Sequence, residues 1–336
     1  MGNIVEIRQR ATQVLESCLK RMQAIGYEHH TLSYSFCPDP SVNAGACASS
    51  HQPVVHKILL NDGLLEKLDH VSAECASYTT TRTEGSVSGI VKQVFSKYVR
   101  RDTRQLIFVF CLSFVFFHEV GHLNQQHRRL RDSRTSGFDN ADFTEAFNWS
   151  DIPIGEEALF RQVLELAADH EGICRSLDLV LALSGPPDKR THHPEYLLWI
   201  AMLSLTLVFH VFQGTRAPLT PLPARGIHPQ PSARMIFLIR ATLDNVRRRA
   251  VHFNAMDDAK LEHTVEDGII AASQFWHGWF DKLPRDRVPQ LHRHLQEPDF
   301  FQQWDEEITR VWNEVAPQLN EQRLCKGVPL PLRGPD

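Results

Sequence analysis

The sequence predicts an α+β fold that is mostly α-helical. Apolar residues recur at helical spacing over most of the chain, while only one segment reads clearly as a strand. Two long apolar runs add buried helices to this pattern. With 336 residues, 42% of them apolar and 23% charged, the chain has the balance of a folded globular protein, which excludes disorder, collagen and a coiled coil as descriptions of the whole.

The N-terminal part contains a helix, a strand and a second helix. Residues 3–25 place apolar side chains at helical spacing, and Gly26 can end that helix. Residues 54–60 (VVHKILL) are rich in apolar and β-branched side chains, which predicts a strand. The turn signal Asn-Asp-Gly follows, and a short helix is expected to begin at Leu64.

The middle of the chain is dominated by buried helices. Residues 104–127 predict one long helix, the polar stretch 128–155 interrupts the pattern, and helix returns near Glu156 and runs past Leu177. After a proline-rich loop over residues 214–231, the chain reads as helical almost to its end.

Two apolar runs raise the question of a membrane. Leu106–Phe117 has 12 residues and Leu197–Phe212 has 16, whereas a membrane-spanning helix needs about 20. We therefore expect two core helices and no membrane span, with 197–212 the only doubtful segment. The predicted organisation is a catalytic domain over residues 1–245 and a helical extension over 246–336 that packs on it.

Charge and cysteine content limit the functional classes. The net charge of −4 and an isoelectric point near 6.5 argue against nucleic-acid binding. The basic clusters at 97–104, 128–134 and 247–249 are therefore read as solvated helix faces. Seven scattered cysteines without a CxxC pair, together with a start that lacks a secretory signal, indicate a cytoplasmic protein. The 18 histidines direct attention to metal binding.

The strongest motif is His118-Glu119-Val120-Gly121-His122. On a helix, positions i and i+4 share a face, so both imidazoles can reach one metal ion. Glu119 then stands where a general base can reach a metal-activated water, the HExxH arrangement of zinc peptidases. The plain alternative is a buried helix whose polar side chains are satisfied by hydrogen bonds. Burial of two histidines and a carboxylate among phenylalanines favours the metal site.

A zinc site needs a third protein ligand. The extended motif with a third histidine fails, because Gln125 and Arg128 occupy the required glycine and histidine positions, and His127 is one residue out of register. Glu165 and Asp169 lie four residues apart on the next predicted helix and share its face. Glu165 can be the third ligand, and Asp169 can accept a hydrogen bond from the far nitrogen of a ligand histidine.

These residues resemble the gluzincin metallopeptidases, in particular the branch of the CaaX prenyl proteases and HtpX-type proteases. That branch has an Asn-Ala segment before a strand and a Gly-Leu-Leu helix, matched here by Val42–Ala44 and Gly63–Leu65. It also carries its third ligand in an ExxxD segment and then an HPxxxxR segment, matched by 165–169 and 228–234. The match covers about residues 40–240.

The resemblance implies a fold and roles for further residues. It implies a small antiparallel sheet beside the HExxH helix, whose edge strand binds the substrate backbone at Asn43 and Ala44. His228 would line the site and stabilise the oxyanion, although a plain loop is the alternative for His228-Pro229. Arg234 would hold the carboxylates of the site. Unlike that branch, the chain lacks clear membrane spans, and in size and layout it also resembles the phage-exclusion Lit-type peptidases.

The function expected is that of a zinc-dependent endopeptidase. Zn²⁺ would be held by His118, His122 and Glu165, and Glu119 would act as general base on a protein or peptide substrate. Two alternatives remain open. One is a partner-binding protein that keeps zinc only as a structural element, against which the intact Glu119 argues. The other is an effector whose protease is latent and gated by the segment 128–155.

Overall fold

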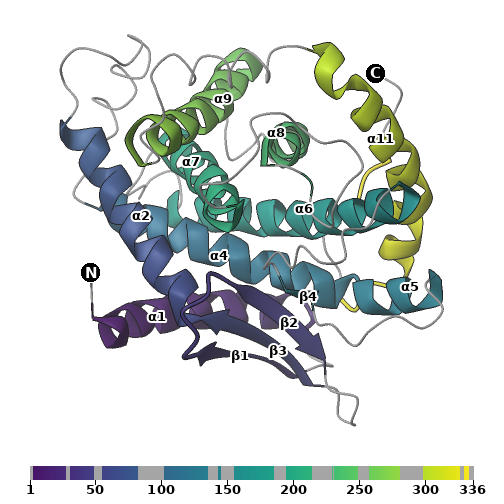
Figure 1. The fold of residues 1–336 in the computed structure, drawn as a ribbon, viewed down its shortest axis with the longest axis horizontal. Helices are drawn as coiled ribbons and strands as arrows, with labels where there is room; N and C mark the ends of the chain where they lie inside the picture. Colours follow the sequence, from purple (N-terminus) through teal and green to yellow (C-terminus); the bar gives the residue numbers. More distant parts are fainter. Residues whose placement is uncertain are drawn as a thin grey trace.

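The computed structural model confirms a mostly helical α+β fold (Figure 1). It describes residues 3–27, 31–48, 55–81, 102–134, 143–144, 155–184, 194–213, 229, 231–248, 257–280, 298–325 and 329–332.

The helices account for most of the described chain. Their bounds are α1 Ile4–Ala24, α2 Asp62–Thr81, α4 Thr103–Asn124, α5 His127–Arg134, α6 Glu156–Ser184, α7 Pro194–Gln213, α8 Pro231–Arg248, α9 Asp258–Phe275, the π-helix η3 Trp276–Phe280, and α11 Pro298–Glu321.

The four strands in the described part of the chain form one small sheet. They are β1 Thr31–Cys37, β2 Ala44–Ala48, β3 Val55–Asn61 and β4 Phe143–Thr144, in the order β1-β3-β2-β4. β3 pairs with β1 in parallel, and β2 pairs antiparallel with both β3 and β4. The prediction of an antiparallel sheet was therefore wrong, since the sheet is mixed. β3 alternates buried and half-buried side chains, and it lies between β1 and β2, while β2 lies between β3 and β4.

The prediction of one long helix over 104–127 was wrong at its C-terminal end. α4 ends at Asn124, and the chain turns before α5 begins at His127. Gln126, between the two helices, has a φ angle of 50°, a left-handed conformation that few residues other than glycine adopt. The segment expected to break the helical pattern, 128–155, contributes most of α5 and also β4.

The second helix begins earlier than predicted. α2 starts at Asp62 rather than Leu64 and extends for 20 residues. Gly63 allows this tight entry, because a Cβ atom there would lie 2.0 Å from the carbonyl oxygen of Pro40. Any side chain at this position would collide with the backbone that leads into β2.

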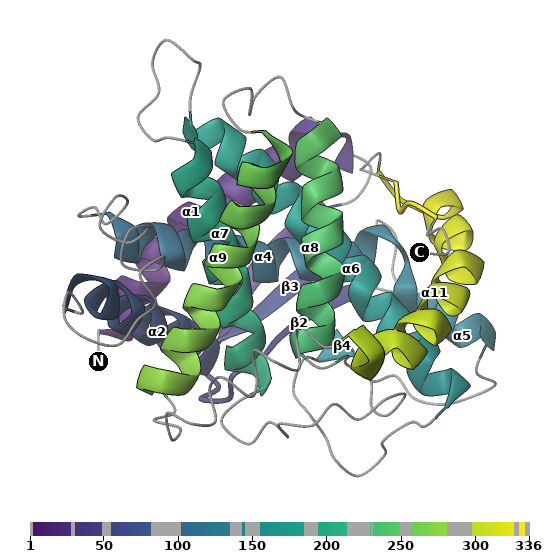
Figure 2. The same ribbon diagram turned by 90° about the horizontal axis from the view of Figure 1, so that it is seen from above.

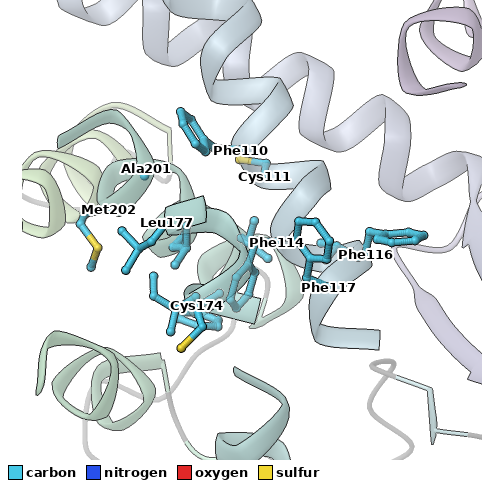
Figure 3. Packing of buried hydrophobic residues seen from close by; sticks show 14 of the residues in the cluster. Phe110, Cys111, Phe114, Phe116, Phe117, Cys174, Leu177, Ala201 and Met202 are labelled. Atoms are coloured by element: carbon cyan, nitrogen blue, oxygen red, sulfur yellow. The ribbon is translucent and has the colours of Figure 1, made fainter. Parts of the chain in front are cut away.

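α4 occupies the centre of the fold. The sheet and α1 lie on one side of it, and α6 and α7 lie on the other (Figure 1). Phe110, Phe114 and Phe117 of α4, with less than 2% of each side chain exposed, belong to a cluster that includes Leu177 of α6 and Met202 of α7 (Figure 3). This apolar packing fixes the helix that carries the HExxH motif.

Two described helices are long and apolar enough to cross a membrane by length and composition alone. They are Thr103–Asn124, the whole of α4, and Pro194–Phe212 in α7, and each is 94% buried inside the fold. Such burial is typical of core helices, and only the described residues were compared with this criterion.

α4 and α6 approach each other unusually closely. A Cβ atom on Gly121 would lie 2.9 Å from the Cα atom of Ala168, and one on Gly172 would lie 2.8 Å from the ring of Phe114. Ala167 and Ala168 are fully buried between the helices. Small residues at these contacts bring the polar side chains of the two helices within reach of one another.

The C-terminal helices enclose the helical side of the molecule. α9 packs on α7 and α8, and α11 packs on α6 near α5 (Figures 1 and 2). The boundary predicted at residue 245 falls inside α8, so the division into two domains stays a prediction.

Candidate metal centre

The two histidines of the HExxH motif and the predicted third ligand meet at the α4–α6 interface. The Nε2 atoms of His118 and His122 lie 3.0 Å apart. Glu165 reaches across from α6, with its Oε2 atom 3.5 Å from Nε2 of His118 and its Oε1 atom 3.7 Å from Nε2 of His122. All three residues are at least 96% buried. Within the described part of the chain, they form the one group of at least three ionisable donors that could hold a metal ion, with ligand atoms within 4.8 Å of one another.

The arrangement of these donors is compatible with a bound metal ion. Nitrogen and oxygen ligands about 2.0–2.1 Å from a tetrahedral ion lie about 3.3 Å from each other. The two Nε2 atoms lie 3.0 Å apart, and each lies 3.5–3.7 Å from a different carboxylate oxygen of Glu165, so the carboxylate faces the pair with both oxygens. The residues present therefore fit a divalent ion, and a His-His-Glu set is one that zinc uses when a position is kept open for chemistry.

His118 is supported by charged groups. Its Nδ1 atom lies 2.9 Å from Oδ1 of Asp169, one turn beyond Glu165 on α6. Arg234 of α8 donates to both oxygens of Asp169, over 2.7 Å from Nε and 2.6 Å from a terminal nitrogen. Burial opposes ionisation of Asp169, but Arg234 and the bond to His118 outweigh it and hold the pKa of Asp169 below its usual range.

Arg234 is itself fixed by packing. Its guanidinium carbon lies 4.3 Å from the centre of the Phe209 ring, close enough for a cation–π contact, and only 4% of the residue is exposed. The ion pair therefore joins three helices, α6, α7 and α8, behind His118.

His122 is supported by neutral groups. Gln125 donates from Nε2 to the carbonyl oxygen of Ala167 on α6, over 3.0 Å. This fixes the amide so that Oε1 of Gln125 accepts a hydrogen bond from Nε2 of His127, over 2.7 Å. The Nδ1 atoms of His127 and His122 lie 2.7 Å apart, the next hydrogen bond in this chain.

These bonds determine which nitrogen of each histidine carries the proton. Burial is the main cause that lowers the pKa of His127 to about 3, so this ring is neutral. With its proton on Nε2, His127 accepts at Nδ1 from Nδ1–H of His122. Asp169 likewise accepts from Nδ1–H of His118. In their neutral forms both ligand histidines then present an Nε2 lone pair toward the other, an arrangement that a shared cation stabilises.

For the other predicted site residues, the structure gives burial or position in the fold but no distance to the three candidate ligands. Glu119 follows His118 on α4 and is 1% exposed. His228 lies outside the described residues, next to the buried Pro229. Asn43 precedes β2, and Ala44 begins it and pairs with Leu60. The expectation of an edge strand at these residues was wrong, because β2 lies between β3 and β4 in the described sheet.

Sequence reasoning missed the role of His127 and Gln125. The apolar pattern predicts an unbroken helix to residue 127, in which His127 would lie away from the face of His122. Only Asn124 hinted at a helix end, because Gln125 and Gln126 are ordinary helix formers and the sequence around them does not mark a turn. The turn brings His127 back onto His122.

Comparisons with protein families, with curated proteins and with solved structures gave no match to this chain. The geometry of the site therefore carries the functional argument.

Proposed function

We propose that the protein is a zinc-dependent endopeptidase, a gluzincin related to the CaaX-protease and HtpX-type branch. One observation carries the proposal: two histidine Nε2 atoms and the carboxylate of Glu165 converge in a buried group that could hold a metal ion, and the buried Glu119 directly follows His118 in the sequence. A purely structural zinc site does not need this additional carboxylate.

In this proposal His118, His122 and Glu165 hold the ion. When bound, zinc supplies Lewis acidity, which acidifies water and polarises a carbonyl at neutral pH. Glu119 takes the proton from the attacking water and later delivers it to the nitrogen of the leaving amine. His228 is the proposed donor to the oxyanion, by its place in the HPxxxxR segment.

The supporting groups keep the ligands in register for this chemistry. Asp169 and Arg234 hold His118 as the Nδ1–H tautomer, and His127 does the same for His122. Both rings then keep Nε2 available as a donor atom.

The test combines metal analysis with digestion of a peptide library. The wild type is expected to carry zinc and to cleave peptides, and Glu119→Gln is expected to keep zinc and lose hydrolysis, because an amide cannot take the proton. The exposed Glu66→Gln, on α2, serves as a matched control that should behave as the wild type. Unchanged cleavage by Glu119→Gln, or a wild type without bound metal, would reject the proposal.

A second candidate is a latent peptidase that acts as a regulated effector. β4, from the segment 128–155, pairs with β2, with Gly45 opposite Thr144 and Ala46 opposite Phe143. Residues 143–144 thus lie along the side of β2 that faces away from β3, where an extended peptide could otherwise add as a strand.

If the peptidase is latent, the wild type is expected to cleave casein only weakly, because β4 occupies the side of β2 where a peptide could add. Replacing both Phe143 and Thr144 with proline removes the one backbone N–H of this pair that an antiparallel ladder directs at β2, and is expected to increase cleavage. Unchanged or lower activity of that variant, in a protein that remains folded, would count against occlusion by β4.

We further propose that the protein works in the cytoplasm on a protein or peptide substrate. The burial of both long apolar helices supports this. Measuring the distribution of the protein between the membrane and soluble fractions of a lysate tests it, and recovery with the membranes after a high-salt wash would contradict it.

A further inference from the structure

The corner between α4 and α5, just after His122, is held by a segment about 200 residues further along the chain. The backbone N–H of Leu324 donates to the carbonyl oxygen of Asn124, over 2.9 Å, and the N–H of Cys325 donates to the Asn124 side-chain oxygen, also over 2.9 Å. We call residues 322–325, which follow α11, the strap.

The strap also bonds the next two residues of the corner. Gln322 donates from its side chain to the carbonyl oxygen of Gln125, and Gln126 donates from its side chain to the carbonyl oxygen of Gln322. Asn124, Gln125 and Gln126 are thus each tied to the strap. Gln126 is the residue with the left-handed backbone, a conformation that persists where the surroundings hold it.

A buried ion cluster anchors the strap to the second helix of the site. Arg323 contacts Glu171 of α6, and Arg175 also pairs with Glu171, over 2.9 Å. Arg323 has 7% of its side chain exposed and Glu171 has 1%. The strap therefore bridges α6 and the end of α4. These two helices carry the three candidate metal ligands.

The corner leads directly to a metal donor. Gln125 positions His127 through the bond from Nε2–H of His127, and His127 accepts from Nδ1–H of His122. Gln125 is held at both ends, because its side chain donates to Ala167 of α6 and its carbonyl accepts from Gln322. A displaced strap would release this glutamine, then His127, and then the orientation of the His122 ring.

We propose that Gln125 and His127 are positioning residues for the ligand His122, and that the strap sets the metal affinity of the site through them. The proposal rests on the metal-binding part of the proposed function and does not require peptidase activity. Hydrogen-bond partners of ligand histidines affect metal affinity by about 10–100-fold in other sites.

The test measures zinc affinity by competition with a chelating dye. His127→Phe keeps a ring of similar size but removes the acceptor for His122, and it is expected to weaken zinc binding about 10–100-fold. Gln322→Ala leaves the three candidate ligands and His127 in place, and it is expected to cause a smaller loss of zinc affinity.

Two further variants separate positioning from general damage. His127→Gln offers one acceptor for His122 and one donor for Gln125, so it should recover much of the affinity that His127→Phe loses. Asn320→Ala is the matched control, because Asn320 bonds Leu330 from α11 without contacting the corner. It should bind zinc as the wild type does.

The absorption spectrum of bound cobalt gives a second readout, since it responds to the geometry of the ligands rather than to stability. A changed cobalt spectrum in Gln322→Ala and His127→Phe, with a normal one in Asn320→Ala, is the expected pattern. If His127→Phe does not fold, Gln322→Ala decides the question.

The inference is overturned if the folded Gln322→Ala and His127→Phe variants both bind zinc as tightly as the wild type. A wild type that binds no zinc would instead overturn the metal centre itself, so the two failures are distinguishable.

Discussion

The two histidine ligands of the candidate metal centre are of the same chemical type but are held by opposite means. His118 is held by a carboxylate that is paired with a buried arginine, whereas His122 is held by a neutral histidine, an amide and a backbone carbonyl. The charged support joins α6 and α8. The neutral support joins the end of α4 to α6 and depends on the strap.

The difference shows how one protein can bury many ionisable groups without an excess of charge. Asp169 and Arg234 neutralise each other, and His127 stays neutral because burial lowers its pKa. In their ionised forms the buried Glu165 and Glu119 then bring two negative charges, which a divalent cation would offset. A second carboxylate behind His122 would have added further negative charge to the same enclosed space.

The largest predicted effect comes from breaking the charged side. Arg234→Met leaves the Asp169 carboxylate buried beside His118 without its cation, and this is expected to cost about 3–5 kcal/mol in the free energy of unfolding. Urea unfolding of the zinc-free protein measures it.

Gln125→Leu is the counterpart on the neutral side and serves as the comparison for Arg234→Met. It removes neutral hydrogen bonds only, so its expected cost is about 1–3 kcal/mol. Equal losses from the two variants would show that the charge of the support has no bearing on stability.

A smaller effect on the free energy of unfolding is expected on acidification. It comes from Glu171, which pairs with Arg323 of the strap. Burial opposes ionisation of Glu171, but Arg323 and Arg175 outweigh it and hold its pKa below the usual value. The folded pKa thus lies below the unfolded value of about 4.3. The cluster therefore stabilises the folded protein above that pH, and this contribution is lost as the pH falls through the folded pKa.

Unfolding measured from about pH 7 down to about pH 3 tests this dependence. Glu171→Gln should lower stability at neutral pH and should lose less on acidification than the wild type. A variant that follows the same pH curve as the wild type would contradict the assignment.

The sequence predicted the main helices well because their signals are local. The apolar spacing of α1 and the buried run of α4 identify helices without knowledge of the rest of the chain. The mixed sheet was not predictable in this way, because β3 pairs in parallel with a strand that precedes β2, and strand order depends on contacts between distant segments.

The candidate ligands could also be predicted from the sequence, because their signals are local. His118 and His122 are related by helical spacing, and Glu165 and Asp169 by the same spacing on the next helix. The support of His122 was not accessible, because it follows from the left-handed turn at Gln126 and from bonds to residues 322–325. These contacts join residues about 200 positions apart, so no local sequence pattern indicates them.

The bond between Asn124 and Cys325 also sets an order of events during synthesis. A ribosome adds about 5–20 residues per second, so about 10–40 s separate the two ends of this contact. For that interval the HExxH helix exists in a nascent chain whose closing segment has not been made. If the strap sets metal affinity, the growing polypeptide holds its ion weakly until residue 325 is added. Any reaction that depends on a bound ion would then be suppressed until that segment has been made.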